Sequence, residues 1–125
     1  MKKINPGLTY ELEELVTFDK SAHHIGSGNL EVYSTPSMIA LIEKTSLRGI
    51  EAFLEKDESS VGGKVNVLHL LPTAIGKRVV CKSTVISIKH NRIEFEVVVF
   101  ENDKLVGKGA HTRFIIDKAS FMAKL

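Results

Sequence analysis

The longest apolar pattern in the chain predicts one amphipathic helix in its first half. Thr35 followed by Pro36 is a typical helix start, because threonine is a good N-cap and proline is tolerated at the first helical position. The apolar positions continue to about Leu54 or Glu55. They leave only a narrow polar stripe at steps of four, three and four: Lys44, Arg48, Glu51 and Glu55. A helix this broadly apolar must be covered by other elements.

The second half of the chain predicts the strands that cover this helix. After a polar loop at 56–60 and two glycines, residues 65–71 alternate with one apolar face until Pro72 ends the strand. Three further segments rich in Val, Ile, Phe and Thr follow, separated by turn residues at 90–91 and 102–103: 77–89, 92–101 and 105–117. No helix-length segment separates them, so an antiparallel meander is the simplest topology.

The first thirty residues carry a weaker pattern. Residues 9–18 fit a strand, although their glutamates also fit a helix. Residues 21–29 are small and polar and include Gly26 and Gly28, which predicts a loop able to line or cover a site. The whole pattern predicts an α+β fold in a single domain spanning 1–125, with one long helix wrapped by a curved antiparallel five-stranded sheet in the order strand, helix, four strands.

Composition narrows the classes of protein. The 17 basic and 15 acidic residues are interleaved and give a formal charge of +2, which argues against a nucleic-acid binder. One cysteine, Cys81, excludes an intrachain disulfide framework and a cysteine-based zinc cage, and leads us to expect a cytoplasmic protein. Neither an apolar signal core near the start nor an apolar window of about 18 residues is present. We therefore expect neither secretion by a standard signal nor a membrane span.

Two polar residues lie on faces that should be apolar. Glu43 falls among apolar helix positions about a quarter turn from the charged stripe, and His69 is in phase with Val65 and Val67 on the strand after the helix. Each has an ordinary structural explanation, a paired carboxylate or a hydrogen-bonded core histidine. Together they can meet between helix and sheet, where carboxylate and imidazole form a general-base pair.

Other candidates are weaker. Thr35 alone is an ordinary N-cap, although a hydroxyl at a helix N-terminus can also hold an anionic oxygen or a polarised carbonyl. His23 and His24 lack further ligands for a metal site, and we interpret them as solvated or packed in the loop. His111 is in phase with two glycines on the last strand, which favours a structural role. We expect no metal.

The order of elements and the spacing of three residues resemble the fluoroacetyl-CoA thioesterase-like branch of the hot-dog superfamily. The features that carry this resemblance are the loop at Ser27 and Gly28, the run 32–43 from Val-Tyr-Ser-Thr-Pro to Glu, the glycine at 62, and His69 in Val-Leu-His. Glu43 follows Thr35 by eight positions and His69 follows Glu43 by twenty-six. The resemblance extends from about residue 9 to 121.

The resemblance implies hydrolysis of a short- or medium-chain acyl-CoA thioester, with Thr35, Glu43 and His69 in the catalytic positions. It places Gly62, Gly63, Arg113, Ser27 and Gly28 at substrate-binding positions. It also implies a homodimer with each site at the interface, or a tetramer of such dimers, and no cofactor apart from the CoA of the substrate. Glu43 would attack the carbonyl to give a mixed anhydride or orient a water that His69 activates.

Two other functions compete with this hypothesis. One is a non-catalytic module that binds acyl-CoA or another acyl thioester. The other is a hot-dog hydratase, but the usual Asp-His hydratase motif is missing. A fluorinated substrate is not expected, because the segment before Thr35 lacks the closely shaped apolar lid that would discriminate fluoroacetyl from acetyl.

Overall fold

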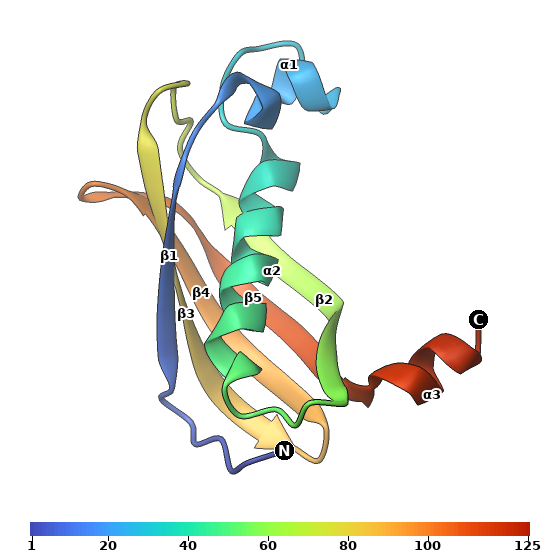
Figure 1. Ribbon diagram of the computed structural model, residues 1–125. Helices are drawn as coiled ribbons and strands as arrows, with labels where there is room; N and C mark the ends of the chain where they lie inside the picture. The colour runs from blue at the N-terminus through green and yellow to red at the C-terminus, as the bar shows by residue number, and fades with distance from the viewer.

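The computed structural model describes residues 1–125 and contains one curved five-stranded sheet, one long helix and three short helices (Figure 1). The sheet is antiparallel throughout, and the long helix α2 crosses one face of it. The α+β architecture predicted from the sequence is confirmed. The elements in chain order are β1 Thr9–Leu15, η1 Phe18–Lys20, α1 Ala22–Ile25, α2 Thr35–Glu51, β2 Glu58–His69, β3 Arg78–Lys89, β4 Arg92–Glu101, β5 Lys104–Asp117 and α3 Lys118–Ala123.

The strand order corrects the simple meander. Strands run β1-β3-β4-β5-β2, so only β3, β4 and β5 form consecutive hairpins. β2 pairs with β5 rather than with β3, which pairs with β1 instead. Because the chain passes from one edge of the sheet to the other through α2, the helix lies diagonally over the sheet, and β1 and β2 are left as edge strands.

The core lies between α2 and the concave face of the sheet. Met38 and Ile42 of the helix are fully buried, and so are Phe95, Val97 and Val99 of β4. The predicted polar stripe of the helix is exposed, as its charged residues lie on the opposite side of α2 from this core. Alternation of apolar and polar positions in the strands therefore identified the inner face correctly.

The largest differences from the sequence prediction are at the end of α2, at the start of β2 and in the loop at 21–29. α2 ends at Glu51, and the apolar pattern continues only because Phe53 and Leu54 pack against the core from the turn that follows. β2 begins at Glu58, within the predicted polar loop, because its first residues pair with the end of β5. The predicted loop at 21–29 contains α1, whose first turn is capped by the Ser21 side chain, which accepts a hydrogen bond from the His24 amide.

A β-bulge interrupts β2 between Gly62 and Lys64. Gly62 pairs with Arg113 and Lys64 pairs with Thr112, so Gly63 has no direct partner in the ladder. On the N-terminal side of the bulge Ser60 is buried, and on the C-terminal side the odd-numbered residues are the less exposed ones.

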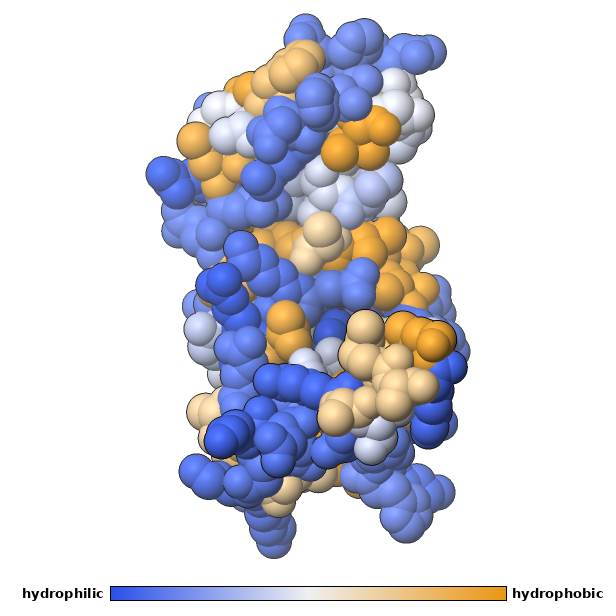
Figure 2. Space-filling model, turned by 45° about the vertical axis from the view of Figure 1, so that its right-hand side comes forward, coloured by the Kyte–Doolittle hydropathy of each residue, from blue (hydrophilic) through white to orange (hydrophobic).

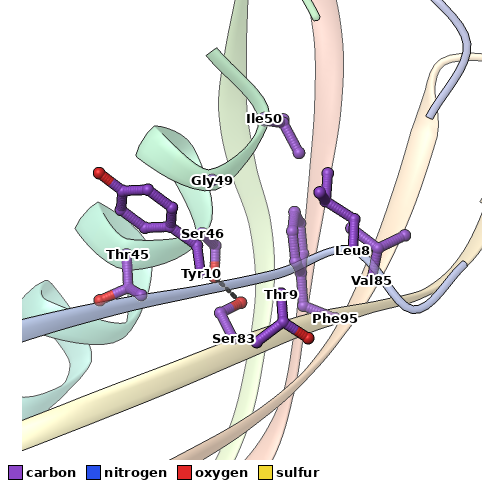
Figure 3. Close-up of a pocket in the computed structure, with 10 residues that line it drawn as sticks. All are labelled: Leu8, Thr9, Tyr10, Thr45, Ser46, Gly49, Ile50, Ser83, Val85 and Phe95. Atoms are coloured by element: carbon purple, nitrogen blue, oxygen red, sulfur yellow. Dashed lines mark hydrogen bonds between the residues drawn. The ribbon is translucent and has the colours of Figure 1, made fainter. Parts of the chain in front are cut away.

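α2 and β1 make a close crossing near the C-terminal end of the helix (Figure 3). Gly49 faces Tyr10 there, and a Cβ at Gly49 would lie 2.9 Å from the Tyr10 Cβ. Beside this contact the Ser46 and Ser83 hydroxyl groups form a buried hydrogen bond of 2.7 Å between α2 and β3. This crossing fixes the height of the helix over the sheet. None of the helices is long and apolar enough to span a membrane.

Candidate active site

The N-terminus of α2 is capped by Ser34 rather than by Thr35. The Ser34 hydroxyl accepts a hydrogen bond of 3.0 Å from the Ser37 amide and donates one of 2.7 Å to the Ser37 hydroxyl. The sequence prediction of Thr35 as N-cap is therefore wrong by one position, and Pro36 occupies the second helical position, where an amide donor is also dispensable. Because Ser34 supplies the cap, the Thr35 hydroxyl is available for other contacts.

Thr35 contacts His69, the last residue of β2. The Thr35 Oγ1 and His69 Nδ1 atoms lie 2.8 Å apart. Burial lowers the pKa of His69, with the nearby backbone of Leu71 acting in the opposite direction, so the ring is neutral at neutral pH. The His69 Nε2 atom is buried without a hydrogen-bond partner. A neutral imidazole next to a hydroxyl at a helix N-terminus is a base in contact with an oxygen nucleophile or with a group that orients one.

A hollow of about 330 Å³ opens beside this pair. Of the two loop residues that the resemblance singled out, Ser27 lines this hollow, whereas Gly28 does not and instead packs against Ala22 of α1. The buried Tyr33 ring stands edge-on to His69 with ring centroids 6.3 Å apart, and its hydroxyl donates a hydrogen bond of 2.6 Å to Glu14 on β1. Tyr33, held in place by Glu14, therefore packs against the imidazole and restricts its orientation.

Glu43 belongs to a second cluster, lower on the helix. Its Oε2 atom lies 3.6 Å from Nη1 of Arg113 on β5, a guanidinium whose side chain is only 6% exposed. Gly62 of β2 faces the same carboxylate, and a Cβ at Gly62 would lie 2.6 Å from that oxygen. The structure thus brings together Glu43, Gly62 and Arg113, three of the positions that the resemblance singled out. Gly63 lies apart from them, because its missing side chain would meet the Phe114 ring instead.

The two clusters are separate within one chain. Glu43 follows Thr35 by eight helical residues, a rise of about 12 Å, and it forms its ion pair with Arg113 while His69 bonds to Thr35. The prediction that Glu43 and His69 meet between helix and sheet is therefore wrong for the single chain. Periodicity established the inward direction of both residues, but not their separation along the helix axis.

Sequence reasoning missed two residues around Arg113. Ser60 binds the guanidinium twice, through its hydroxyl at 2.8 Å from Nε and its carbonyl at 3.0 Å from Nη2. His111, interpreted as structural, lies 3.1 Å from Nη1 of the same guanidinium. Ser60 fell in a stretch predicted as loop. For His111, its phase with Arg113 on one strand was the available signal.

Comparison with known proteins matches this arrangement of elements. A family model described as fluoroacetyl-CoA-specific thioesterase matches residues 16–119, which contain every residue of both clusters. The chain belongs to this family. The resemblance recognised from Thr35, Glu43 and His69 is thus confirmed, and membership in this thioesterase family confirms the expected enzyme class, a thioester hydrolase.

Individual relatives agree with the family assignment. The fluoroacetyl-CoA thioesterase of Streptantibioticus cattleyicolor is 30% identical over 95 residues, which is 76% of this chain and 68% of the relative. A solved structure of a fluoroacetyl-CoA thioesterase superposes with a TM-score of 0.92 at 25% identity, covering 98% of this chain and 96% of that one. A thioesterase superfamily member from Thermus thermophilus gives 0.92 at 28% identity over 99% and 92% of the two chains. The hot-dog fold is confirmed by these superpositions.

Proposed function

We propose that this protein hydrolyses short- or medium-chain acyl-CoA thioesters to a carboxylic acid and CoA. The observation that carries the proposal is the 2.8 Å contact between Thr35 and His69 at the edge of an open hollow. The name of the Streptantibioticus relative, and a solved relative in complex with fluoroacetate and CoA, support CoA thioesters as the substrate class. We propose no cofactor beyond the CoA of the substrate, and a cytoplasmic location, which suits the single buried thiol of Cys81.

His69 serves as the general base in this proposal. Its neutral ring takes a proton from the attacking oxygen, and the Thr35 hydroxyl holds that oxygen or the developing oxyanion in place. The N-terminus of α2 adds the positive end of the helix dipole beside Thr35. The thioester carbonyl would therefore lie in the hollow with its oxygen directed toward the helix.

Glu43 has two routes by which it would contribute. In one, its carboxylate attacks the thioester carbonyl, expels the CoA thiolate and leaves a mixed anhydride that water then cleaves. In the other, it orients the water from which His69 takes a proton. Turnover in H₂¹⁸O followed by mass spectrometry of the Glu43 peptide tests the first route. Label in the Glu43 carboxylate shows an anhydride that water cleaves at the Glu43 carbonyl, whereas an unlabelled carboxylate after many turnovers shows that water attacks the substrate acyl carbonyl.

A homodimer would unite the two clusters. The Glu43 side chain is 42% exposed although it points from α2 toward the sheet. It lies beside β2, an edge strand whose outer backbone N–H and C=O groups have no neighbouring strand to pair with. Figure 2 turns the β2 and α3 side forward and shows apolar groups gathered at mid-height on this face. Leu68, at the end of β2, is 57% exposed. A second copy that packs against this face along β2 would place its Glu43 near the Thr35 and His69 pair of the first.

Mixing two inactive variants tests this shared site. A mixture of Glu43→Gln and His69→Gln proteins, unfolded and refolded together, forms mixed dimers with one intact site if the clusters come from different copies. Half of the dimers are then mixed, so about a quarter of wild-type activity should return. No recovery, with mixed dimers confirmed by native mass spectrometry, would show that each site uses one chain only. Analytical ultracentrifugation of the wild type gives the oligomeric state.

The activity itself is tested by release of free thiol. A panel of acyl-CoA substrates from two to twelve carbons, followed with DTNB, should show turnover of the shorter members by wild type and its loss in Glu43→Gln and His69→Gln. Tight binding of the panel by calorimetry without thiol release would contradict the proposal and favour a non-catalytic acyl-CoA-binding module.

A further inference from the structure

His111 lies on β5, between β4 and the edge strand β2, two residues before Arg113 on the same face of the sheet. It lies opposite Val65 of β2 and Phe95 of β4 in the strand register, and its side chain has no exposed surface. The ring stacks on Phe95 with a centroid separation of 6.0 Å and an interplanar angle of 25°. These contacts leave the imidazole one orientation, with one nitrogen directed to each side.

The two partners of His111 determine its tautomer. Nδ1 lies 2.7 Å from the Lys64 carbonyl oxygen, which can only accept, so Nδ1 carries the proton. In a neutral ring Nε2 is then unprotonated and accepts a hydrogen bond of 3.1 Å from Arg113 Nη1. A doubly protonated ring would direct an N–H group at the guanidinium N–H and lose this bond.

Burial and the charges around His111 determine whether its ring takes up a second proton. Burial is the largest effect and lowers the pKa of His111, and the adjacent positive charge of Arg113 lowers it further. The Lys64 backbone on β2, the Glu43 carboxylate on α2 and the Glu94 carboxylate on β4 act in the opposite direction. The net effect keeps the ring neutral, as the tautomer requires.

The guanidinium nitrogen that donates a hydrogen bond to His111 is the one that faces Glu43. Ser60 holds Nε and Nη2, which leaves Nη1 to His111 and to the Glu43 carboxylate at 3.6 Å. We propose that His111 is a positioning residue, whose unprotonated Nε2 holds Arg113 Nη1 at Glu43 and so fixes that carboxylate for reaction. This inference rests on the role of Glu43 in the proposed function.

Two substitutions separate the two bonds of His111. Asparagine places its amide near Nδ1, so His111→Asn can still donate to Lys64 but offers no acceptor to Arg113. Glutamine reaches the position of Nε2, so His111→Gln can accept from Arg113 but cannot bond Lys64. We expect kcat to fall about 10²-fold in His111→Asn with KM within about threefold. In His111→Gln we expect kcat to stay within about threefold of wild type.

A lower kcat in His111→Gln than in His111→Asn would overturn the inference, and so would a kcat equal to that of wild type in His111→Asn. His90→Asn is the matched control, since His90 lies in the β3–β4 turn at a positive φ of 58°, where asparagine is tolerated. Its kcat should equal that of wild type. Wild type that releases no thiol would contradict the proposed function, whereas active wild type with an unimpaired His111→Asn contradicts only the role of His111.

A measurement on wild type keeps the inference testable if both variants misfold. Long-range ¹H–¹⁵N correlation spectra should show His111 with a protonated Nδ1 and an unprotonated Nε2 at neutral pH. The Nε2–H tautomer or a doubly protonated ring would overturn the proposed acceptor role. This result depends on neither substrate nor activity.

Discussion

The Thr35 hydroxyl lies 2.8 Å from His69 Nδ1 because its neighbour Ser34, and not Thr35, caps helix α2. Two adjacent hydroxyl residues thus divide two tasks at one helix terminus. Ser34 satisfies the amide of Ser37, and Thr35 is left exposed at the edge of the hollow with its oxygen against the imidazole. Substitutions at these two positions should consequently have different effects.

Thr35→Val should lower kcat about 10²-fold, because valine keeps the shape of the side chain but cannot hydrogen bond to His69. Thr35→Ser keeps the hydroxyl and should retain most of the activity. Steady-state thiol release with both variants checks this prediction. Equal activity of the valine and serine variants would show that the hydroxyl takes no part in the reaction.

Ser34→Ala should lower the free energy of unfolding by about 1 kcal/mol, the usual cost of losing an N-cap. Thr35→Ala should change it by less, since Thr35 caps no amide. Urea denaturation of the two variants under the same conditions gives the comparison. A larger loss for Thr35→Ala than for Ser34→Ala would contradict the assignment of the cap.

Gly62→Ala should lower kcat with little loss of stability. Its new methyl group would lie 2.6 Å from the end of the flexible Glu43 side chain, which can move away but then leaves its position beside Arg113. Its other close neighbours, His111 Cε1 at 3.3 Å and Arg113 Nη1 at 3.4 Å, need to shift by only a few tenths of an ångström. Gly49→Ala is the matched control, because its methyl group meets the Tyr10 Cβ at the crossing of α2 and β1. That variant should lose stability, measured as a lower melting temperature. The prediction fails if Gly62→Ala is the less stable of the two and keeps full kcat.

The stability of the fold should fall as pH drops below about 6.5. Burial lowers the pKa of both His69 and His111 below the ordinary value of 6.5, so the unfolded chain binds protons that the folded chain does not. Stability is therefore complete above that pH and declines as pH falls through the lowered values. The lowered carboxyl pKa values, such as that of Glu94, add their effect only at lower pH. Urea denaturation between pH 7.5 and 5 should show a shallower decline in His111→Gln than in wild type.

The spacing of apolar residues predicted most of the helices and strands, because each of these elements buries one face in the core. β4 was predicted at its observed bounds, 92–101, since a segment rich in Val, Ile and Phe lies between two turn signals. The start of β2 was missed because Glu58 and Ser59 are polar, and they are held in the sheet by pairing with β5 rather than by burial. The order of strands was also missed, since local patterns do not record which edge a strand joins.

The site was predictable to the extent that its residues break a pattern. Glu43 and His69 stand out on apolar faces, and Thr35 was added through the family spacing. His111 and Ser60 were missed because each looks ordinary in its own segment and acquires meaning only through Arg113. Their contact comes from the pairing of β2 with β5, which joins residues about fifty positions apart.

The bulge at Gly63 has a consequence for how this family can change in length. Ser60 and Gly62 face the helix as even-numbered residues, and His69 faces it as an odd-numbered one, so the extra residue reverses the alternation between the two clusters. Deleting one residue here would turn either Gly62 or His69 to the outer surface. Insertions and deletions that preserve activity should therefore come in pairs along β2, or fall outside the stretch from 60 to 69.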